Sequence, residues 1–200
     1  MGAPYPARRR LLRNFFARPT LEVAPDLLGH IIVVRTTRTL LAARLVEVEA
    51  YLGVGEDPAS HAQRGETPRN LQMFETPGRL YVYFTYGMHH CMNVVCESEG
   101  RAGAVLLRAG EPLAGESLMA RRRGRKGLDL ANGPAKLCQA LGIDRRHDGL
   151  DLVTGPVGIW PGTPPDAIER SSRVGIRQGT DLLFRFFDPS SPHISPGPPS

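Results

Sequence analysis

Cysteine is scarce in this sequence. Its three cysteines, Cys91, Cys96 and Cys138, do not pair off evenly and do not have the spacing of a zinc site. Disulfides are therefore not expected to stabilise the fold, and an iron–sulfur cluster is not indicated. This use of cysteine is typical of a reducing, cytoplasmic compartment.

Long apolar runs are also lacking. A membrane-spanning helix needs about 18 or more consecutive apolar residues, and no stretch of this chain reaches that length. The apolar run nearest the start, Leu11 to Phe16, is interrupted by Arg13 and Asn14 and does not have the form of a signal peptide. We expect neither a signal peptide nor association with a membrane.

Lysine is also in short supply, because only Lys126 and Lys136 occur among the 25 lysine and arginine residues. Arginine supplies the rest, and the chain carries a net charge of +5 with a sequence pI near 9.5. Such a charge indicates an acidic partner, with nucleic acid ahead of a membrane surface.

The length of 200 residues predicts one domain with a real hydrophobic core. Residues 1–14 are expected to form a flexible basic arm that precedes it. From Pro189 onward the chain is rich in serine and proline, and residues 192–200 are expected to form a tail without apolar material for a core.

The stretch LVEVEAY, Leu45 to Tyr51, alternates apolar and polar residues as a half-buried β-strand does. A period of two places Glu47, Glu49 and Tyr51 on one face of the strand. Two carboxylates about 6 to 7 Å apart can raise one another's pKa, and a glutamate tuned in this way can act as a general base. The alternative is that this face is simply solvated.

Further elements follow from the same reasoning. A short helix is expected with Thr20 as its N-cap and its end at Gly29. A second is expected from Asn132, as N-cap, to Leu141 with a buried stripe of Leu137, Cys138 and Leu141. The pattern predicts strands at residues 31–36, 40–51, 104–109, 150–152, 157–160 and 182–187.

Residues 52–79 are interrupted by many glycines and prolines and are expected to form a long functional loop. Four polar residues of this loop are candidates to converge on a ligand: His61, Arg64, Arg69 and Asn70. The next stretch, GRLYVYFTYGMHHCMNVVCESE, predicts a β-hairpin with Tyr86 at its tip. An aromatic residue there either caps the sheet edge or projects toward a partner.

The segment Leu118 to Leu130 is strongly basic and contains two glycines, so it is expected to be a mobile loop more than a helix. Its arginines Arg121, Arg122 and Arg123 are candidates for contacts with the DNA backbone, although many such runs are only solvated.

The stretches VEVEAY, DPASH, TPRN, PGRLYVYFTYGMHHCMNVV, LLRAGEP and NGPAKLCQALGI, in this order, resemble the alkyladenine (3-methyladenine) DNA glycosylase family of monofunctional base-excision repair enzymes. The resemblance runs from Phe15 to Ser191 and implies a glycosylase domain over residues 15–191. It implies an α/β (α+β) fold, with a curved antiparallel β-sheet, surrounding helices and a protruding β-hairpin that enters the minor groove.

The resemblance also implies roles for individual residues. Glu49 is expected to activate the attacking water as general base, and Arg108 to help hold that water. Tyr86 is expected to insert into the DNA in place of the flipped nucleotide, which offsets part of the cost of unstacking.

The base pocket is implied in the same way. Tyr51 is expected to stack on one face of the flipped base, with His61 and Tyr83 on the other face. Asn93 is expected to obstruct the exocyclic amine of guanine, and Leu106 to line the pocket.

The expected activity is release of an alkylated or deaminated purine from duplex DNA by a monomeric enzyme without cofactor or metal. The resemblance also implies a cytoplasmic, nucleoid-associated protein in a bacterium, or a nuclear one in a eukaryote. Two alternatives remain open: an inactive damage-binding module, and a metal-dependent nuclease that uses Glu47, Glu49, Asp57, His61, His89 and His90. Against the nuclease, consecutive histidines on a strand face opposite ways, and no spaced ligand set is present.

Overall fold

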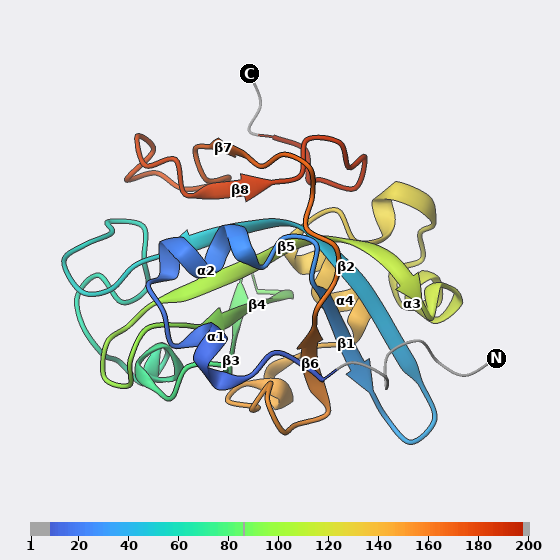
Figure 1. Cartoon of the computed structure of the whole chain (residues 1–200), viewed down its shortest axis with the longest axis horizontal. Helices are drawn as coiled ribbons and strands as arrows, with labels where there is room; N and C mark the ends of the chain where they lie inside the picture. The colour runs from blue at the N-terminus through green and yellow to red at the C-terminus, as the bar shows by residue number, and fades with distance from the viewer. Residues whose placement is uncertain (1–8, 86, 198–200) are drawn as a thin grey trace.

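The computed structural model describes residues 9–85 and 87–197 of the chain (Figure 1). The expectation for Tyr86 therefore lies outside the described residues. The helices are α1 (Arg13–Phe16), α2 (Thr20–Asp26), α3 (Glu116–Arg123) and α4 (Pro134–Leu141), and the 3₁₀ turns are η1 (Leu71–Phe74), η2 (Gly127–Leu130) and η3 (Arg145–His147). The strands are β1 (Ile31–Arg35), β2 (Leu40–Tyr51), β3 (Leu80–Thr85), β4 (His89–Val95), β5 (Ala104–Ala114), β6 (Val157–Trp160), β7 (Glu169–Ser171) and β8 (Arg185–Phe187).

The described strands form one antiparallel sheet with the order β3-β4-β5-β2-β1-β6, and β7 and β8 join it beside β2. The long strands β2 and β5 cross the middle of the molecule, the sheet is strongly curved, and α2 lies in front of it in this view (Figure 1). This arrangement confirms the expected mixed α and β fold with a curved antiparallel sheet.

The two faces of the sheet have different roles. Val48, Val94 and Leu107 face the main core, where they join apolar side chains of α2 and α4. Residues on the opposite face, such as Tyr81 and Tyr83, join a smaller cluster under the loop of residues 52–79. The alternation along β2 and β3 thus separates a packed core from a face that is available for a site.

Several expected elements are confirmed. The first two strands form the expected hairpin, with Ile31 paired to Arg44, and β3 and β4 form the second hairpin, with Leu80 paired to Val94. Helix α4 buries the expected stripe that includes Cys138. No helix of the described ranges is long and apolar enough to cross a membrane.

The expected end of the fifth strand at Ala109 is wrong. Strand β5 continues through Gly110 and Pro112 to Ala114, beside β2. Pro112 is paired with Ala43, next to a shift in the register of the two strands, and at such an irregularity a residue without an N–H is tolerated. A side chain at Gly110 would lie 3.0 Å from the Cβ of Ala43, so glycine permits the close approach of the two strands.

The mobile loop expected at residues 118–130 is also wrong at its start, because α3 occupies residues 116–123. Gly124 does not break this helix but ends it, with a left-handed φ of 61°. The strand expected at residues 150–152 is reduced to a single bridge between Arg79 and Asp151. Sequence patterns overestimated the disruptive effect of glycine here because a glycine just past a helix stabilises its end.

Two helix starts differ from the expectation. Gly133, not Asn132, is the N-cap of α4, and the side-chain oxygen of Asn132 instead accepts a hydrogen bond from Lys136. Helix α2 starts after Pro19 and ends at Asp26, with Pro25 in its last turn.

Arg123 allows a test of whether an arginine of the basic run stabilises the fold. Its guanidinium donates to the backbone oxygens of Leu130 and Asp129 and to the side chain of Gln139, and so ties α3 to η2 and α4. We expect Arg123→Ala to lower the thermal midpoint by about 2–8 °C, since lost hydrogen bonds of this kind cost about 1–2 kcal/mol. The exposed Arg121 is the matched control, and Arg121→Ala is expected to leave the midpoint unchanged. Equal midpoints for both variants in thermal melts would contradict this role.

Candidate active site

A cavity of about 360 Å³ opens on the polar face of the sheet. This volume is in the range of small-molecule sites in proteins. The cavity is lined by Tyr51, Ala59, His61, Met73, Tyr81, Tyr83, Thr85, Cys91, Asn93, Leu106, Arg108, Pro134, Val174, Gly175 and Ile176. Six of the site residues expected from the sequence are therefore in its wall: Tyr51, His61, Tyr83, Asn93, Leu106 and Arg108.

Strand register explains how these residues meet. Glu49 on β2 is paired with Leu106 on β5, which is paired with Asn93 on β4, which in turn is paired with Tyr81 on β3. Residues directly opposite one another in a sheet point to the same face. One row across four strands thus brings the carboxylate, the pocket floor and an aromatic wall to one side.

Glu49 lies directly beneath this pocket and is fully buried. Its carboxylate accepts hydrogen bonds from the Val174 amide at 2.7 Å and the Tyr51 hydroxyl at 2.9 Å, and it pairs with Arg108 at 3.2 Å. All three partners belong to the pocket wall. Since a carboxylate has about four acceptor positions, these contacts leave room for one more donor.

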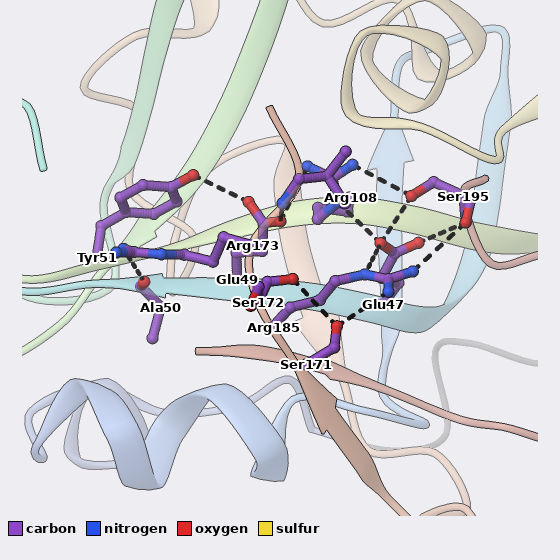
Figure 2. Close-up of polar contacts among 11 residues, drawn as sticks. Glu47, Glu49, Ala50, Tyr51, Arg108, Ser171, Ser172, Arg173, Arg185 and Ser195 are labelled. Carbon is purple, nitrogen blue, oxygen red and sulfur yellow. Dashed lines mark hydrogen bonds and ion pairs between the residues drawn. The ribbon is translucent and has the colours of Figure 1, made fainter. Parts of the chain in front are cut away.

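Glu47, two residues earlier on β2, is fully buried as well. Its Oε1 accepts from the Nε atoms of Arg108 at 2.8 Å and Arg185 at 2.7 Å (Figure 2). The register between β2 and β5 shifts at this point, with Glu47 opposite Ala109 and Val48 opposite Leu107. The bulge leaves Arg108 without a paired residue and lets its side chain reach both carboxylates.

The pKa values of the two carboxylates are shifted in opposite directions. Burial raises the pKa of Glu49, and Arg108 and the Val174 amide offset this only in part. Burial acts in the same direction on Glu47, but Arg108, the amide of Ser195 and Arg185 outweigh it and lower its pKa. Paired groups whose pKa values are pushed apart are typical of acid–base sites. Glu49 is thus suited to accept a proton, and Glu47 to remain charged. The solvated-face alternative for this strand is wrong.

Tyr51 forms one wall of the pocket and is supported from behind. The guanidinium of Arg173 lies 4.6 Å from the centre of its ring and pairs with the fully buried Asp57 through two hydrogen bonds of 2.6 and 2.7 Å. Arg173 also donates to the backbone oxygen of Ala50. These contacts fix the orientation of the ring that faces the cavity.

His61 and Tyr83 form another part of the wall, with their rings 4.6 Å apart and nearly perpendicular. The Nδ1 of His61 shares a hydrogen bond of 2.9 Å with the hydroxyl of Tyr81. Desolvation of the imidazole, together with the charge of Arg69, lowers the pKa of His61. A neutral imidazole beside two tyrosine rings makes this wall aromatic and uncharged.

Asn93 and Leu106 form the floor. The amide nitrogen of Asn93 donates to the backbone oxygen of Tyr81 at 3.1 Å, which fixes the side chain in the pocket. Asn70, another candidate, has a different role, because it bonds Thr67, Gly65 and the backbone of His61 within the loop. Asn70 therefore positions His61 from outside the pocket wall.

The candidate residues for DNA-backbone contacts divide into two kinds. Arg122 and Arg123 donate to backbone oxygens of the helical segments next to them, including Ala140 and Leu130. Arg121 is exposed on the surface of α3.

The hairpin that leads to Tyr86 carries two exposed apolar side chains, Phe84 and Met88.

Sequence reasoning missed Tyr81, Cys91, Arg173, Val174, Arg185 and Ser195 as members of the site or its support. One signal was available for Arg185, because an arginine within the apolar run LLFRFF is unusual on a strand unless it has a buried partner. The contact of Arg173 with Asp57 joins residues 116 positions apart, and that of Ser195 with Glu47 joins residues 148 positions apart, so neither left a local pattern.

Four of the six side chains named for a nuclease have other partners. Glu47 and Glu49 bind arginines, Asp57 binds Arg173, and His61 binds Tyr81. Within residues 9–85 and 87–197, no three His, Cys, Asp or Glu side chains gather as metal ligands do.

The opposite pKa shifts predict opposite effects of two substitutions. The folded-state pKa of Glu49 is raised, so its stabilising contribution is full below about pH 4.5 and is lost as pH rises through the folded value. The gain in thermal midpoint of Glu49→Gln over wild type should therefore increase from pH 4 to pH 8.

The folded-state pKa of Glu47 is lowered, so its contribution is present above about pH 4.5 and is lost as pH falls through the folded value. Glu47→Gln should destabilise the protein at neutral pH by about 3–5 kcal/mol, the cost of breaking a buried ion pair, and by less in acid. Thermal melts of both variants across this range test the pair. If the thermal midpoints of the two variants changed with pH in the same way, the pKa values of the two carboxylates would not be shifted in opposite directions.

Comparison with known proteins places these features in a family. A family model described as methylpurine-DNA glycosylase (MPG) matches residues 14–192. A relative from Chlorobium phaeovibrioides is 51% identical over 195 residues, which cover 96% of this chain and 99% of the relative.

Relatives from Streptomyces avermitilis and Burkholderia lata are 50% and 47% identical. The alignments cover 96% and 92% of this chain and 93% and 90% of the relatives. All three relatives bear the name "Putative 3-methyladenine DNA glycosylase". The family match spans the sheet, the pocket and both buried carboxylates. The chain therefore belongs to the methylpurine-DNA glycosylase family and is a DNA glycosylase, an enzyme of DNA repair.

Proposed function

We propose that this enzyme flips an alkylated or deaminated purine out of duplex DNA into the pocket and hydrolyses its N-glycosidic bond. The products are the free base and an abasic site. The observation that carries the proposal is the buried Glu49, whose raised pKa and position beneath the pocket wall suit a general base. The names of the relatives support the same substrate class.

The chemistry follows from the contacts of Glu49 and Arg108. A water at the pocket floor attacks C1′ of the sugar as the glycosidic bond breaks, and its proton passes to Glu49. The bonding electrons leave with the base, which neutralises the charge of a cationic alkylated purine. A deaminated purine is neutral, so it must also take up a proton from solvent as it leaves. Positive charge that develops on the sugar is stabilised by the carboxylate. Arg108 orients the water through its position beside Glu49.

The walls of the pocket suit a flipped purine. Tyr51 offers an aromatic face whose other side is occupied by Arg173, and the His61–Tyr83 pair offers the opposite wall. Flipped bases are commonly held between aromatic side chains in this way. Asn93 and Leu106 at the floor are positioned to select among purines by their exocyclic groups.

The partner in this proposal is double-stranded DNA, bound by one copy of the chain. Tyr86 follows β3 and precedes β4, and we assign it the role of the wedge that fills the vacated stack on the basis of the family resemblance. The exposed Arg121 is the candidate of the basic run that is best placed for a phosphate. An inactive binding module would not need the Glu49–Arg108 pair, which is intact.

Substitution of Glu49 tests the proposal directly. Glu49→Gln should lower the single-turnover release of 3-methyladenine from dimethyl-sulfate-treated duplex DNA by about a hundredfold or more, the scale of a lost general base. Binding to the same DNA should stay within a few-fold. Glu111→Gln, which changes a carboxylate outside the pocket wall, is the matched control and should behave as wild type. Near-normal base release by Glu49→Gln would refute the assignment.

Asn93 tests the selection among purines. Its replacement by alanine removes an amide from the floor, so activity on alkylated guanine should rise by about tenfold or more relative to alkylated adenine. The measurement is the ratio of 7-methylguanine to 3-methyladenine released from the same methylated DNA. An unchanged ratio, with adenine activity retained, would place the discrimination elsewhere.

A further inference from the structure

The buried carboxylate of Glu47 depends on a residue from the far end of the chain. Beside its two arginine partners, it accepts hydrogen bonds from both the backbone amide and the hydroxyl of Ser195 (Figure 2). The hydroxyl contact is 2.7 Å long, and Ser195 is itself only 4% exposed. Half of the donors around this charge therefore come from one serine in the segment predicted to be a tail.

Ser195 also contacts Arg108 directly. The guanidinium of Arg108 has an acceptor at each of its three nitrogens: Nε donates to Glu47, Nη1 pairs with Glu49, and Nη2 donates to the Ser195 hydroxyl at 3.1 Å. A planar group held at three corners has one orientation. The hydroxyl supplies the only one of these three acceptors that is not a carboxylate.

The segment before Ser195 is attached to the same strand as the two carboxylates. The amide of Asp188 donates to the backbone oxygen of Val46, and its carboxylate binds Arg44 at 2.7 Å. Ser191 then bonds back to Asp188, which turns the chain over β2. Arg185 adds a longer contact of 3.4 Å to the backbone oxygen of Ser195. These anchors place the serine within the arginine–glutamate network and not in solvent.

We propose that Ser195 is a positioning residue for Arg108, and that residues 192–197 close the rear of the active site. Without the hydroxyl, Nη2 of Arg108 loses its acceptor and Glu47 loses one of its four donors. The guanidinium then loses the fixed orientation that holds the attacking water. This proposal rests on the proposed function of Glu49 and Arg108, and it concerns a residue beyond residue 192, where the family match ends.

The test uses the full chain and two pairs of variants. Ser195→Ala is compared with Ser190→Ala, because the Ser190 hydroxyl bonds only Asp188 within its own turn. A chain that stops after Ser191 is compared with one that stops after Gly197, which retains Ser195. Each is assayed for single-turnover release of 3-methyladenine at saturating enzyme, for the enzyme concentration at half-maximal rate, and for thermal midpoint.

We expect Ser195→Ala and the chain ending at Ser191 to lose about 10- to 100-fold in the saturating rate, the scale of a misplaced catalytic group. The half-maximal concentration should stay within a few-fold. The midpoint of Ser195→Ala should fall by only a few degrees, the scale expected for two lost hydrogen bonds. Both control variants should match wild type.

Three results would overturn the proposal: a normal saturating rate for Ser195→Ala, a loss confined to the half-maximal concentration, or a loss that follows a large fall in the thermal midpoint. Glu49→Gln is assayed in parallel. Activity retained by Glu49→Gln contradicts the proposed function itself, whereas an inactive Glu49→Gln beside a fully active Ser195→Ala contradicts only the role of Ser195.

Discussion

The burial of two carboxylates on one strand is the constraint on which the site depends. Glu47 and Glu49 are both removed from water, and a buried charge is tolerated only with close partners. Arg108 serves both, Arg185 and Ser195 complete the environment of Glu47, and Val174 and Tyr51 complete that of Glu49. Three residues of the pocket wall, Arg108, Val174 and Tyr51, are therefore also among the groups that compensate this charge.

In the proposed mechanism this arrangement separates support from chemistry. Glu47 has the partners of a permanent anion and pairs with both Arg108 and Arg185. Glu49 has fewer positive neighbours and a raised pKa, and it lies next to the cavity. Two chemically identical side chains on one face thus differ because Arg185 and Ser195 bind the first of them and not the second.

Sequence patterns predicted what depends on neighbours along the chain. Alternation in Leu45 to Tyr51 indicated a strand with both glutamates on one face, and the buried stripe of α4 was predicted from its spacing. The short α3 was missed because Gly124 and Gly127 indicated a loop, whereas Gly124 lies just past the end of the helix. Contacts of Arg173 and Ser195 were not predictable, because periodicity says nothing about residues more than a hundred positions away.

The chain positions of these contacts have a consequence for the order of folding. Glu47 is made early in synthesis, but its partners Arg108, Arg185 and Ser195 follow 61, 138 and 148 residues later. Contacts between distant residues form late, since the loop between them must close first. The two carboxylates therefore remain solvated until the chain has been made as far as Ser195. Recovery of activity during refolding thus requires contacts that span up to 148 residues, in addition to the formation of the sheet.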